Sequence, residues 1–374
     1  MQCKLILNTD KTKCIIFNKT GRLIRKHFSF NNIQLETVRS YKYLGFLLTP
    51  SGEIKSGLND LRDRALKAFF KLKSTMGNEF NRDISITLSL IDSLIKPILL
   101  YCSDFWGAIK PPKDNPIEKF HYMACKHVLG VQKQTTNTGV LLELGRIPLQ
   151  TYAIKAATKN WERIRSGKVN PNIRISFENA IKDNLPWVGN IREYLERNGM
   201  MCFYINSYEN KPSFIHKKLF QKLSDIFHQN ALSEISSPQS KLRTYGLLKT
   251  TIGLENYLTT ISNPLIRRSV SKFRLSNHNL NIEIGRYQNI PKEMRFCHFC
   301  RDIVECEVHF LVACPTYKAL RDEILKCKPS FEYYSPIEKF QYLLSDENIL
   351  VTSELIHNCF EVRNFLVKNP KRNI

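Results

Sequence analysis

Four side chains suited to holding a metal ion lie close together in the stretch FCHFCRDIVECEVHFLVACP, residues 296–315. Cys297 and Cys300 have the CxxC spacing, which forms a turn that points two thiolates at one ion. His309 and Cys314 follow with HxxxxC spacing. Three cysteines and one histidine fill the four positions of tetrahedral zinc and leave none for a reactive water, so the stretch predicts a structural zinc ion.

Two neighbouring residues leave the ligand set open. His298 and Cys306 lie within reach of the same ion, and either could replace one of the four ligands. The alternative to a metal site is a pair of buried free cysteines beside an ordinary core histidine. The HxxxxC half of the motif favours the metal, because a CxxC alone supports both interpretations equally.

The chain carries a large positive charge: 56 Lys and Arg against 34 Asp and Glu give its 374 residues a formal net charge of +22. Such a surplus repels itself unless a polyanion neutralises it, and the usual intracellular polyanion is nucleic acid. We therefore expect RNA, DNA or both as partners.

The sequence lacks the marks of a membrane or secreted protein. It has no run of about 18 uncharged apolar residues, and its first residues lack the apolar core of a signal peptide. Eleven cysteines, an odd number, favour reduced thiols and metal binding over disulfides. These features predict an intracellular protein without membrane contact, in the nucleus, the cytoplasm or both.

Basic residues that could contact phosphates concentrate near the cysteine cluster. One group shares a helix expected over about 264–275, and another flanks the metal loop. The first group is Arg267, Arg268, Lys272 and Arg274, and the second is Arg286, Arg295 and Arg301. The aromatic residues that could stack on unpaired bases, or belong to the core, are Phe273, Tyr287, Phe296 and Phe299.

The hydrophobic pattern predicts an α+β protein that is mostly helical. Short strands of a small antiparallel sheet are expected within residues 1–52, with a hairpin turn at Asn31-Asn32. Beyond residue 53, apolar residues recur every three or four positions, as in amphipathic helices. The expected helices cover about 58–72, 85–106, 117–129, 149–164, 214–235, 264–275, 317–325 and 354–367.

Changes in composition divide the chain into four segments, 1–52, 53–165, 166–262 and 263–374. The first alternates like strands and the second is helical. The third opens with residues 166–215, which are rich in Asn, Gly, Pro and Tyr and predict a domain boundary. The fourth combines the basic helix with the cysteine cluster.

Two parts of the chain resemble one family. LNTDKTKCIIFN at 7–18 and YKYLGFLLTPSG at 41–52, followed by a basic amphipathic helix, resemble the end of the palm and the start of the thumb in non-LTR retrotransposon (LINE-type) reverse transcriptases. The C-terminal run KFRLSNHNLNIEIGRYQNIPKEMRFCHFC…HFLVACPTYKALR at 272–321 is similar to the zinc-binding region that follows the polymerase in the same elements. The resemblance covers most of residues 4–325.

This resemblance implies an identity for each segment. Residues 1–52 would be a palm remnant with a β-hairpin and 53–165 a helical thumb-like domain. Residues 166–262 would be a helical connecting region, and 263–374 a zinc-binding helical module.

The resemblance also implies contacts with nucleic acid near the N-terminus. Lys11 and Lys13 match the segment just after the family's catalytic turn. Tyr43 and Gly45 match a hairpin that lies near the primer strand. The family's zinc ligands match the four residues identified above.

One departure limits what the resemblance implies about activity. The family's polymerase holds Mg²⁺ with an aromatic-x-Asp-Asp turn, and the chain contains no Asp-Asp pair and no nuclease motif. We therefore expect a truncated reverse-transcriptase-like protein that binds RNA or DNA, is not an enzyme and needs no Mg²⁺. A complete reverse transcriptase is a candidate partner.

Two alternatives stay open. The chain could be a fragment of a longer RNA-directed DNA polymerase, or it could be a zinc-organised interaction module or inert remnant. The sequence does not choose between RNA and DNA, nor does it show whether the chain folds stably without the rest of a palm.

Overall fold

The computed structural model describes residues 8, 11–167, 169–205, 214–237, 240–249, 252–325 and 333–369. The protein is mostly helical, with 61% helix and small sheets, which confirms the predicted class in outline. None of the described helices combines the length and the apolar character needed to cross a membrane. The chain forms two compact units: unit 1 comprises 1–72, 91–121 and 148–223, and unit 2 comprises 73–90, 122–147 and 224–374.

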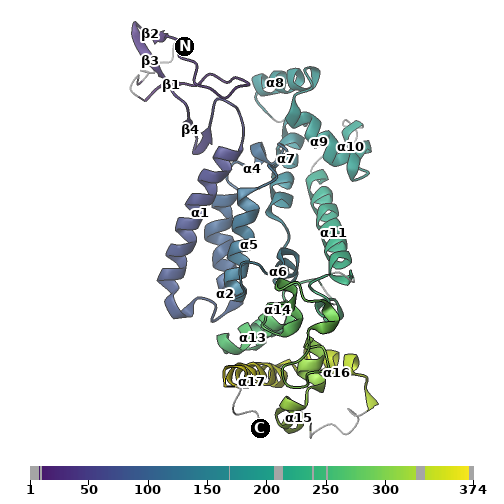
Figure 1. The fold of residues 1–374 in the computed structure, drawn as a ribbon. Coiled ribbons are helices and arrows are strands. Elements are labelled where there is room, and N and C mark those ends of the chain that lie inside the picture. Colours follow the sequence, from purple (N-terminus) through teal and green to yellow (C-terminus); the bar gives the residue numbers. More distant parts are fainter. Residues whose placement is uncertain are drawn as a thin grey trace. The chain divides into compact units, whose positions relative to one another are not determined.

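The strands that the structure describes all belong to unit 1 (Figure 1). A three-stranded sheet has the order β1-β3-β2, and a separate hairpin joins β4 and β5. The strands are β1 (Lys13–Cys14), β2 (Phe28–Phe30), β3 (Ile33–Thr37), β4 (Tyr41–Tyr43) and β5 (Phe46–Leu48).

Strand pairing follows the turn chemistry, with one correction. Asn31 and Asn32 have φ of 48° and 62°, which suits the tight turn that pairs β2 antiparallel to β3. The β4–β5 hairpin is antiparallel too. These pairings fit the expected small antiparallel sheet, and β1 is the exception, since it pairs parallel with β3, Lys13 opposite Glu36. Parallel pairing is open to β1 because a long connection separates it from β3.

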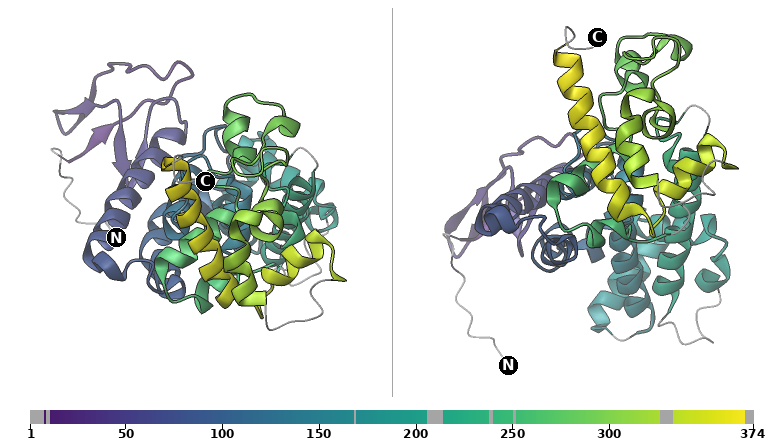
Figure 2. Two further views of the ribbon diagram at one scale, coloured as in Figure 1. Left: turned by 60° about the horizontal axis from the view of Figure 1, so that its bottom comes forward. Right: turned by 90° about the horizontal axis from the view of Figure 1, so that it is seen from below.

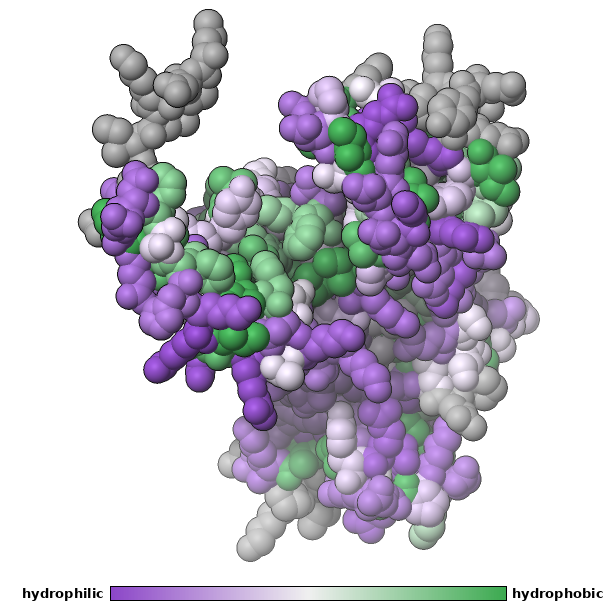
Figure 3. All heavy atoms as spheres, turned by 90° about the horizontal axis from the view of Figure 1, so that it is seen from above, coloured by the Kyte–Doolittle hydropathy of each residue, from purple (hydrophilic) through white to green (hydrophobic). Residues whose placement is uncertain are grey.

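Unit 1 contains most of the N-terminal helices. The helices that lie in it or enter it are α1 (Lys55–Met76), α3 (Lys96–Leu99), α4 (Ser103–Trp106), α5 (Pro116–Leu129), α7 (Leu149–Arg165), α8 (Pro171–Lys182), α9 (Pro186–Arg197), α10 (Met201–Ile205) and α11 (Ile215–Ser236). Helix α1 buries Leu58, Leu61, Ala65 and Phe69, the stripe that its periodicity predicts. Figure 3 shows hydrophobic side chains exposed among hydrophilic ones on the face of unit 1 that carries the strands and α8.

The single helix expected over 85–106 is interrupted. It consists of α2 (Ile84–Leu90), the π-helical turn η2 (Ile91–Ile95), α3 and α4. Pro97 lacks the N–H that would continue the α-helical ladder, so the bonds of the preceding turn shift. Cys102, with φ of 54°, then separates α3 from α4.

Three helices lie within residues 166–215, where composition suggested a boundary and the resemblance implied a helical region without giving the bounds of its helices. They are α8, α9 and α10. Their buried residues, among them Phe177, Ile191 and Leu195, form one hydrophobic core with Trp161 of α7. Pro171 and Pro186 begin α8 and α9 at positions where proline is favoured, and these were the missed sequence signals.

Unit 2 holds the C-terminal helices and the cysteine cluster. Its helices, besides α2, are α6 (Asn137–Glu143), α12 (Tyr257–Thr260), α13 (Pro264–Arg274), α14 (Asn281–Tyr287), α15 (Lys318–Leu325), α16 (Pro336–Leu343) and α17 (Ile349–Lys368). Figure 2 shows α17 as one long helix, and it packs against α13 and α15. At this contact Phe273 lies 6.0 Å, ring centre to ring centre, from each of Phe310, Phe340 and Phe360.

Candidate metal centre and nucleic-acid interface

The four predicted ligands converge in unit 2. One ligand atom from each of Cys297, Cys300, His309 and Cys314 lies within 4.8 Å of all the others. The Sγ atom of Cys314 is 4.0 Å from that of Cys297 and 3.8 Å from that of Cys300. Thiolates bound to one tetrahedral zinc ion at about 2.3 Å would lie about 3.8 Å apart. The cluster therefore has the dimensions to hold a metal ion.

His309 supplies a second sign of a metal site. Both of its ring nitrogens are buried, and neither makes a hydrogen bond of normal geometry with the described residues. A buried imidazole without a partner is costly, because its polar atoms have lost water and gained nothing. A metal ion between the imidazole and the three thiolates would satisfy one of the nitrogens.

Two local turns bring the ligands together. Cys297 follows a bridge between Phe296 and Val304, and its N–H donates to the carbonyl of Ile303 at 2.7 Å. This closes the loop that holds Cys297 and Cys300. His309 opens the π-helical turn η5 (His309–Ala313), and the N–H of Cys314 donates to the His309 carbonyl at 2.8 Å. The wide turn returns Cys314 to the same side as His309.

Neither alternative ligand belongs to the cluster. His298 is exposed inside the CxxC turn. The Sγ atom of Cys306 instead accepts a hydrogen bond from the backbone N–H of His309 at 3.4 Å. The structure thus favours the ligand set with both residues excluded.

A hydrogen bond between two of the thiols shifts their pKa values in opposite directions. Hydrogen bonding with Cys314, followed by burial, raises the pKa of Cys297 to about 12. The same hydrogen bond lowers the pKa of Cys314. Thiols this close cannot all ionise unless a positive charge lies between them, and a bound cation would supply it.

Two buried acids, which sequence reasoning missed, anchor the metal loop. Glu305 pairs with Arg363 of α17, Nη2 to Oε2 at 2.7 Å. Glu307 pairs with Arg243 at 2.7 Å and with His278 at 3.0 Å, and these contacts lower the pKa of Glu307 to about 2 against the effect of burial. Buried charges are tolerated only when paired in this way. The available sequence signal was the presence of two acids, Glu305 and Glu307, between the metal ligands of a chain in which basic residues outnumber acidic ones.

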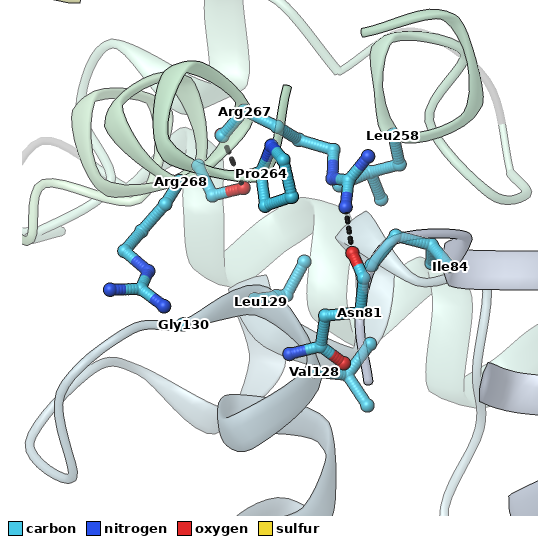
Figure 4. A pocket seen from close by; sticks show the side chains of 10 residues that line it. Asn81, Ile84, Val128, Leu129, Gly130, Leu258, Pro264, Arg267 and Arg268 are labelled. Atoms are coloured by element: carbon cyan, nitrogen blue, oxygen red, sulfur yellow. Dashed lines mark hydrogen bonds between the residues drawn. The ribbon is translucent and has the colours of Figure 1, made fainter. Parts of the chain in front are cut away.

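Arg267 is buried, which corrects its assignment as a phosphate contact. It is only 4% exposed. Its guanidinium donates to the carbonyl of Ile261 at 2.6 Å and to those of Asn81 and Arg82 (Figure 4). It therefore joins α13 to the loop before α2. Figure 4 shows Arg268 extending from the same helix towards Gly130, and Arg268 is exposed.

Arg274 is also buried and also corrects the prediction. It is 3% exposed, and it pairs with Glu143 of α6, Nε to Oε1 at 2.8 Å, and with Glu255. Tyr257 donates to the same Glu143 oxygen at 2.6 Å. These acids hold the Nε and Nη2 atoms of a buried guanidinium, so Arg274 is not accessible to a phosphate.

The other candidate basic residues divide by exposure. Arg286 and Arg301 are exposed and Lys272 is half-buried. Arg295 is half-buried and donates to the carbonyls of Ile290 and Ile282 at 2.9 and 2.8 Å, which ties it to the backbone. Of the predicted phosphate contacts in unit 2, Arg268, Arg286 and Arg301 are therefore exposed, and Lys272 is partly accessible.

The aromatic candidates divide in the same way. Phe273 is buried in the core, whereas Tyr287 is 61% exposed and lies under the guanidinium of Arg286, 5.5 Å from its ring centre. Phe296 is partly exposed and Phe299 packs edge-on against Tyr317. Tyr287 is thus the most accessible stacking surface of the four.

The N-terminal candidates lie in unit 1. Lys11 is exposed, and Lys13 pairs with Glu36 across the β1–β3 contact at 2.6 Å. Tyr43 is 59% exposed at the end of β4. Gly45, with φ of 84°, forms the β4–β5 turn, where a Cβ would lie 3.2 Å from the ring of Tyr101. The glycine is therefore required by the turn itself.

Comparison with known proteins gives no further assignment. No family model, no curated protein and no solved structure matches the chain. The function must therefore be argued from the residues and geometry described above.

Proposed function

We propose that this protein binds RNA or DNA and that a structural zinc ion, held by Cys297, Cys300, His309 and Cys314, organises part of its binding surface. The observation that carries the proposal is the convergence of these four ligand atoms within 4.8 Å of one another. Three thiolates and one imidazole suit zinc better than the harder magnesium or calcium ions. All four positions come from protein, so the ion stabilises the fold and does not activate water.

Charge supports nucleic acid as the partner. The chain has a formal net charge of +22, and buried pairs such as Arg274–Glu143 and Arg363–Glu305 cancel, so this positive excess remains on the exposed surface. Arg286 and Arg301 are exposed near the ligands in the sequence, and Arg268 is exposed on α13. Phosphate contacts from such residues give binding that is largely independent of sequence and weakens with salt.

The resemblance to LINE-type reverse transcriptases supports the same proposal. The exposed Lys11 and Tyr43 would provide contacts with nucleic acid in unit 1. Polymerase chemistry requires carboxylates that hold Mg²⁺, and the chain contains no Asp-Asp pair. We therefore limit the proposed activity to binding.

A titration at two salt concentrations tests this proposal. Labelled single-stranded RNA, single-stranded DNA and duplex DNA would be titrated with the protein at about 50 and 200 mM salt. We expect binding to at least one of them and a fall in affinity of tenfold or more between the two conditions. If the protein binds none of the three at the lower salt concentration, the proposal is wrong.

Single substitutions locate the surface. We expect each of three single variants, Arg268→Ala, Arg286→Ala and Arg301→Ala, to weaken binding. Each should also reduce the slope of log affinity against log salt concentration by about one, the value for one lost phosphate contact. Arg197→Ala on α9 removes an exposed charge in unit 1 and serves as the control. If the control weakens binding as much as the three variants do, the effect is one of net charge and the proposed surface is wrong.

A further inference from the structure

Unit 1 contains a cavity of about 220 Å³ between α7, α8 and α10. Trp161 and Ile164 of α7 and Phe177 of α8 line its inner part and are almost completely buried. Ile181 of α8, 47% exposed, lies at its mouth. This volume lies below the roughly 300–1,000 Å³ of pockets for drug-sized ligands, so the cavity suits a smaller group.

The aromatic rings of the cavity are held in place by the protein. Trp161 and Tyr204 are parallel, with 8° between their planes and 5.7 Å between their centres. The guanidinium of Arg165 lies 4.8 Å from the centre of Trp161 and donates to the carbonyls of Phe203 and Tyr204. The positions of these rings are therefore fixed before a ligand binds at the mouth of the cavity, which lowers the entropic cost of binding.

Positive charge predominates around the same cavity. Arg165 and Arg174 line it, and Arg192 lies 6.0 Å from the centre of the Tyr204 ring. The acid among the lining residues is Glu178, which pairs with Arg174 at 3.0 Å on the exposed surface of α8. An exposed pair of this kind contributes little stability, so Arg174 can exchange its carboxylate partner for a phosphate.

Aromatic walls and a cationic rim together fit a planar ring that carries negative charge. We propose that this cavity binds one unpaired nucleotide of a single-stranded nucleic acid, with its base against the half-buried Tyr204 and the exposed Ile181 and its phosphate at Arg174. The inference rests on the proposed function and adds to it a site for an unstacked base. A base within a duplex is paired and stacked on both faces, so it cannot enter such a cavity.

Filling the mouth of the cavity tests the inference. Ile181→Trp would place a large ring at the mouth, at a position exposed enough to accept it. Ile175→Trp makes the same change on the same helix at a position that is 55% exposed and outside the cavity lining. Arg174→Ala removes the proposed phosphate contact without adding bulk.

The probe is a 12-nucleotide single strand that carries one 2-aminopurine, compared with a duplex of the same length. The native protein should quench the fluorescence of 2-aminopurine in the single strand, because the base stacks on an aromatic ring. Ile181→Trp should weaken single-strand binding at least about fivefold, the lower end of the range for one stacked base, and should remove the quenching. Arg174→Ala should weaken binding to the single strand more than to the duplex, and Ile175→Trp should behave like the native protein.

The outcomes separate this inference from the proposed function. If the protein binds both probes, and neither Ile181→Trp nor Arg174→Ala changes single-strand affinity or quenching, the cavity is not a nucleotide site while the proposed function stands. Equal losses in Ile181→Trp and Ile175→Trp would also overturn the inference. If the native protein binds neither probe at low salt, the proposed function fails and this inference fails with it.

Discussion

Arg363 of α17 donates hydrogen bonds from Nε and Nη2 to the two carboxylate oxygens of Glu305, at 2.8 and 2.7 Å. Both side chains are buried. Glu305 precedes His309 by four residues, and its Oε2 also accepts from the backbone N–H of Asn281 at 2.6 Å. One ion pair therefore joins the last described helix, the metal loop and the start of α14.

Removing one partner of this pair should destabilise unit 2 strongly. Arg363→Met leaves the Glu305 carboxylate buried without its cation, which costs about 3–5 kcal/mol in such cases. The free energy of unfolding from urea titration measures the loss. The double variant Arg363→Met with Glu305→Leu should recover part of it, since no unpaired charge is left. A loss below about 1 kcal/mol in the single variant would show that water reaches the carboxylate.

Loss of the metal ligands should remove zinc and loosen the core beneath them. Cys297→Ser combined with Cys300→Ser should reduce the metal content of the purified protein from one zinc ion per chain to none. The melting temperature should fall by roughly 10 °C, as expected for about 3–5 kcal/mol in a chain of this size.

Cys306→Ser provides the matched control for the metal site. Its sulfur accepts a backbone hydrogen bond and stands outside the cluster, so the substitution should leave the zinc content unchanged. If this variant loses zinc while the ligand variant keeps it, the ligand assignment is wrong.

Arg267 and Arg268, adjacent on α13, should give opposite results. Arg267→Ala leaves the carbonyls of Ile261, Asn81 and Arg82 without this donor, and the free energy of unfolding should fall by about 3 kcal/mol or more. Arg268→Ala, at an exposed position, should change it by less than about 0.5 kcal/mol. Chemical denaturation of both variants checks this, and equal losses would contradict the assigned burial.

Glu118 should make stability fall as the pH rises. Burial raises its pKa to about 7, although its carboxylate accepts a hydrogen bond from the N–H of Gln150 at 2.6 Å at the start of α7. The folded state therefore keeps a proton that the unfolded state has released, and the stability conferred by the protonated carboxyl is lost between about pH 4.5 and pH 7.

A neutral side chain at this position separates the contribution of Glu118 from that of other groups. The free energy of unfolding should fall less steeply with pH in Glu118→Gln. The difference from the native protein, summed over that interval, should be up to about 3 kcal/mol. Glu178→Gln, at an exposed site on α8, is the control. An unchanged slope in Glu118→Gln would show that the carboxyl is ionised in the folded protein throughout the interval.

Local patterns predicted much of the secondary structure but not its interruptions. The stripe of Leu58, Leu61, Ala65 and Phe69 correctly gave α1, because an amphipathic period is a property of neighbouring residues. The break at η2 depended on how Pro97 rearranges the hydrogen bonds of the preceding turn. The bounds of helices α8 to α10 were missed because polar and turn-forming residues obscured the few apolar positions that these helices bury.

The sequence alone pointed to Cys297, Cys300, His309 and Cys314 as metal ligands, since CxxC and HxxxxC spacings allow local turns to bring them together, and the structure then excluded the alternatives His298 and Cys306. It also determined the excess of positive charge, which does not depend on folding. Only the tertiary structure decided which basic residues stay accessible. Glu143 meets Arg274 across 131 positions of sequence, and a pairing over that distance depends on how helices pack, which no local pattern contains.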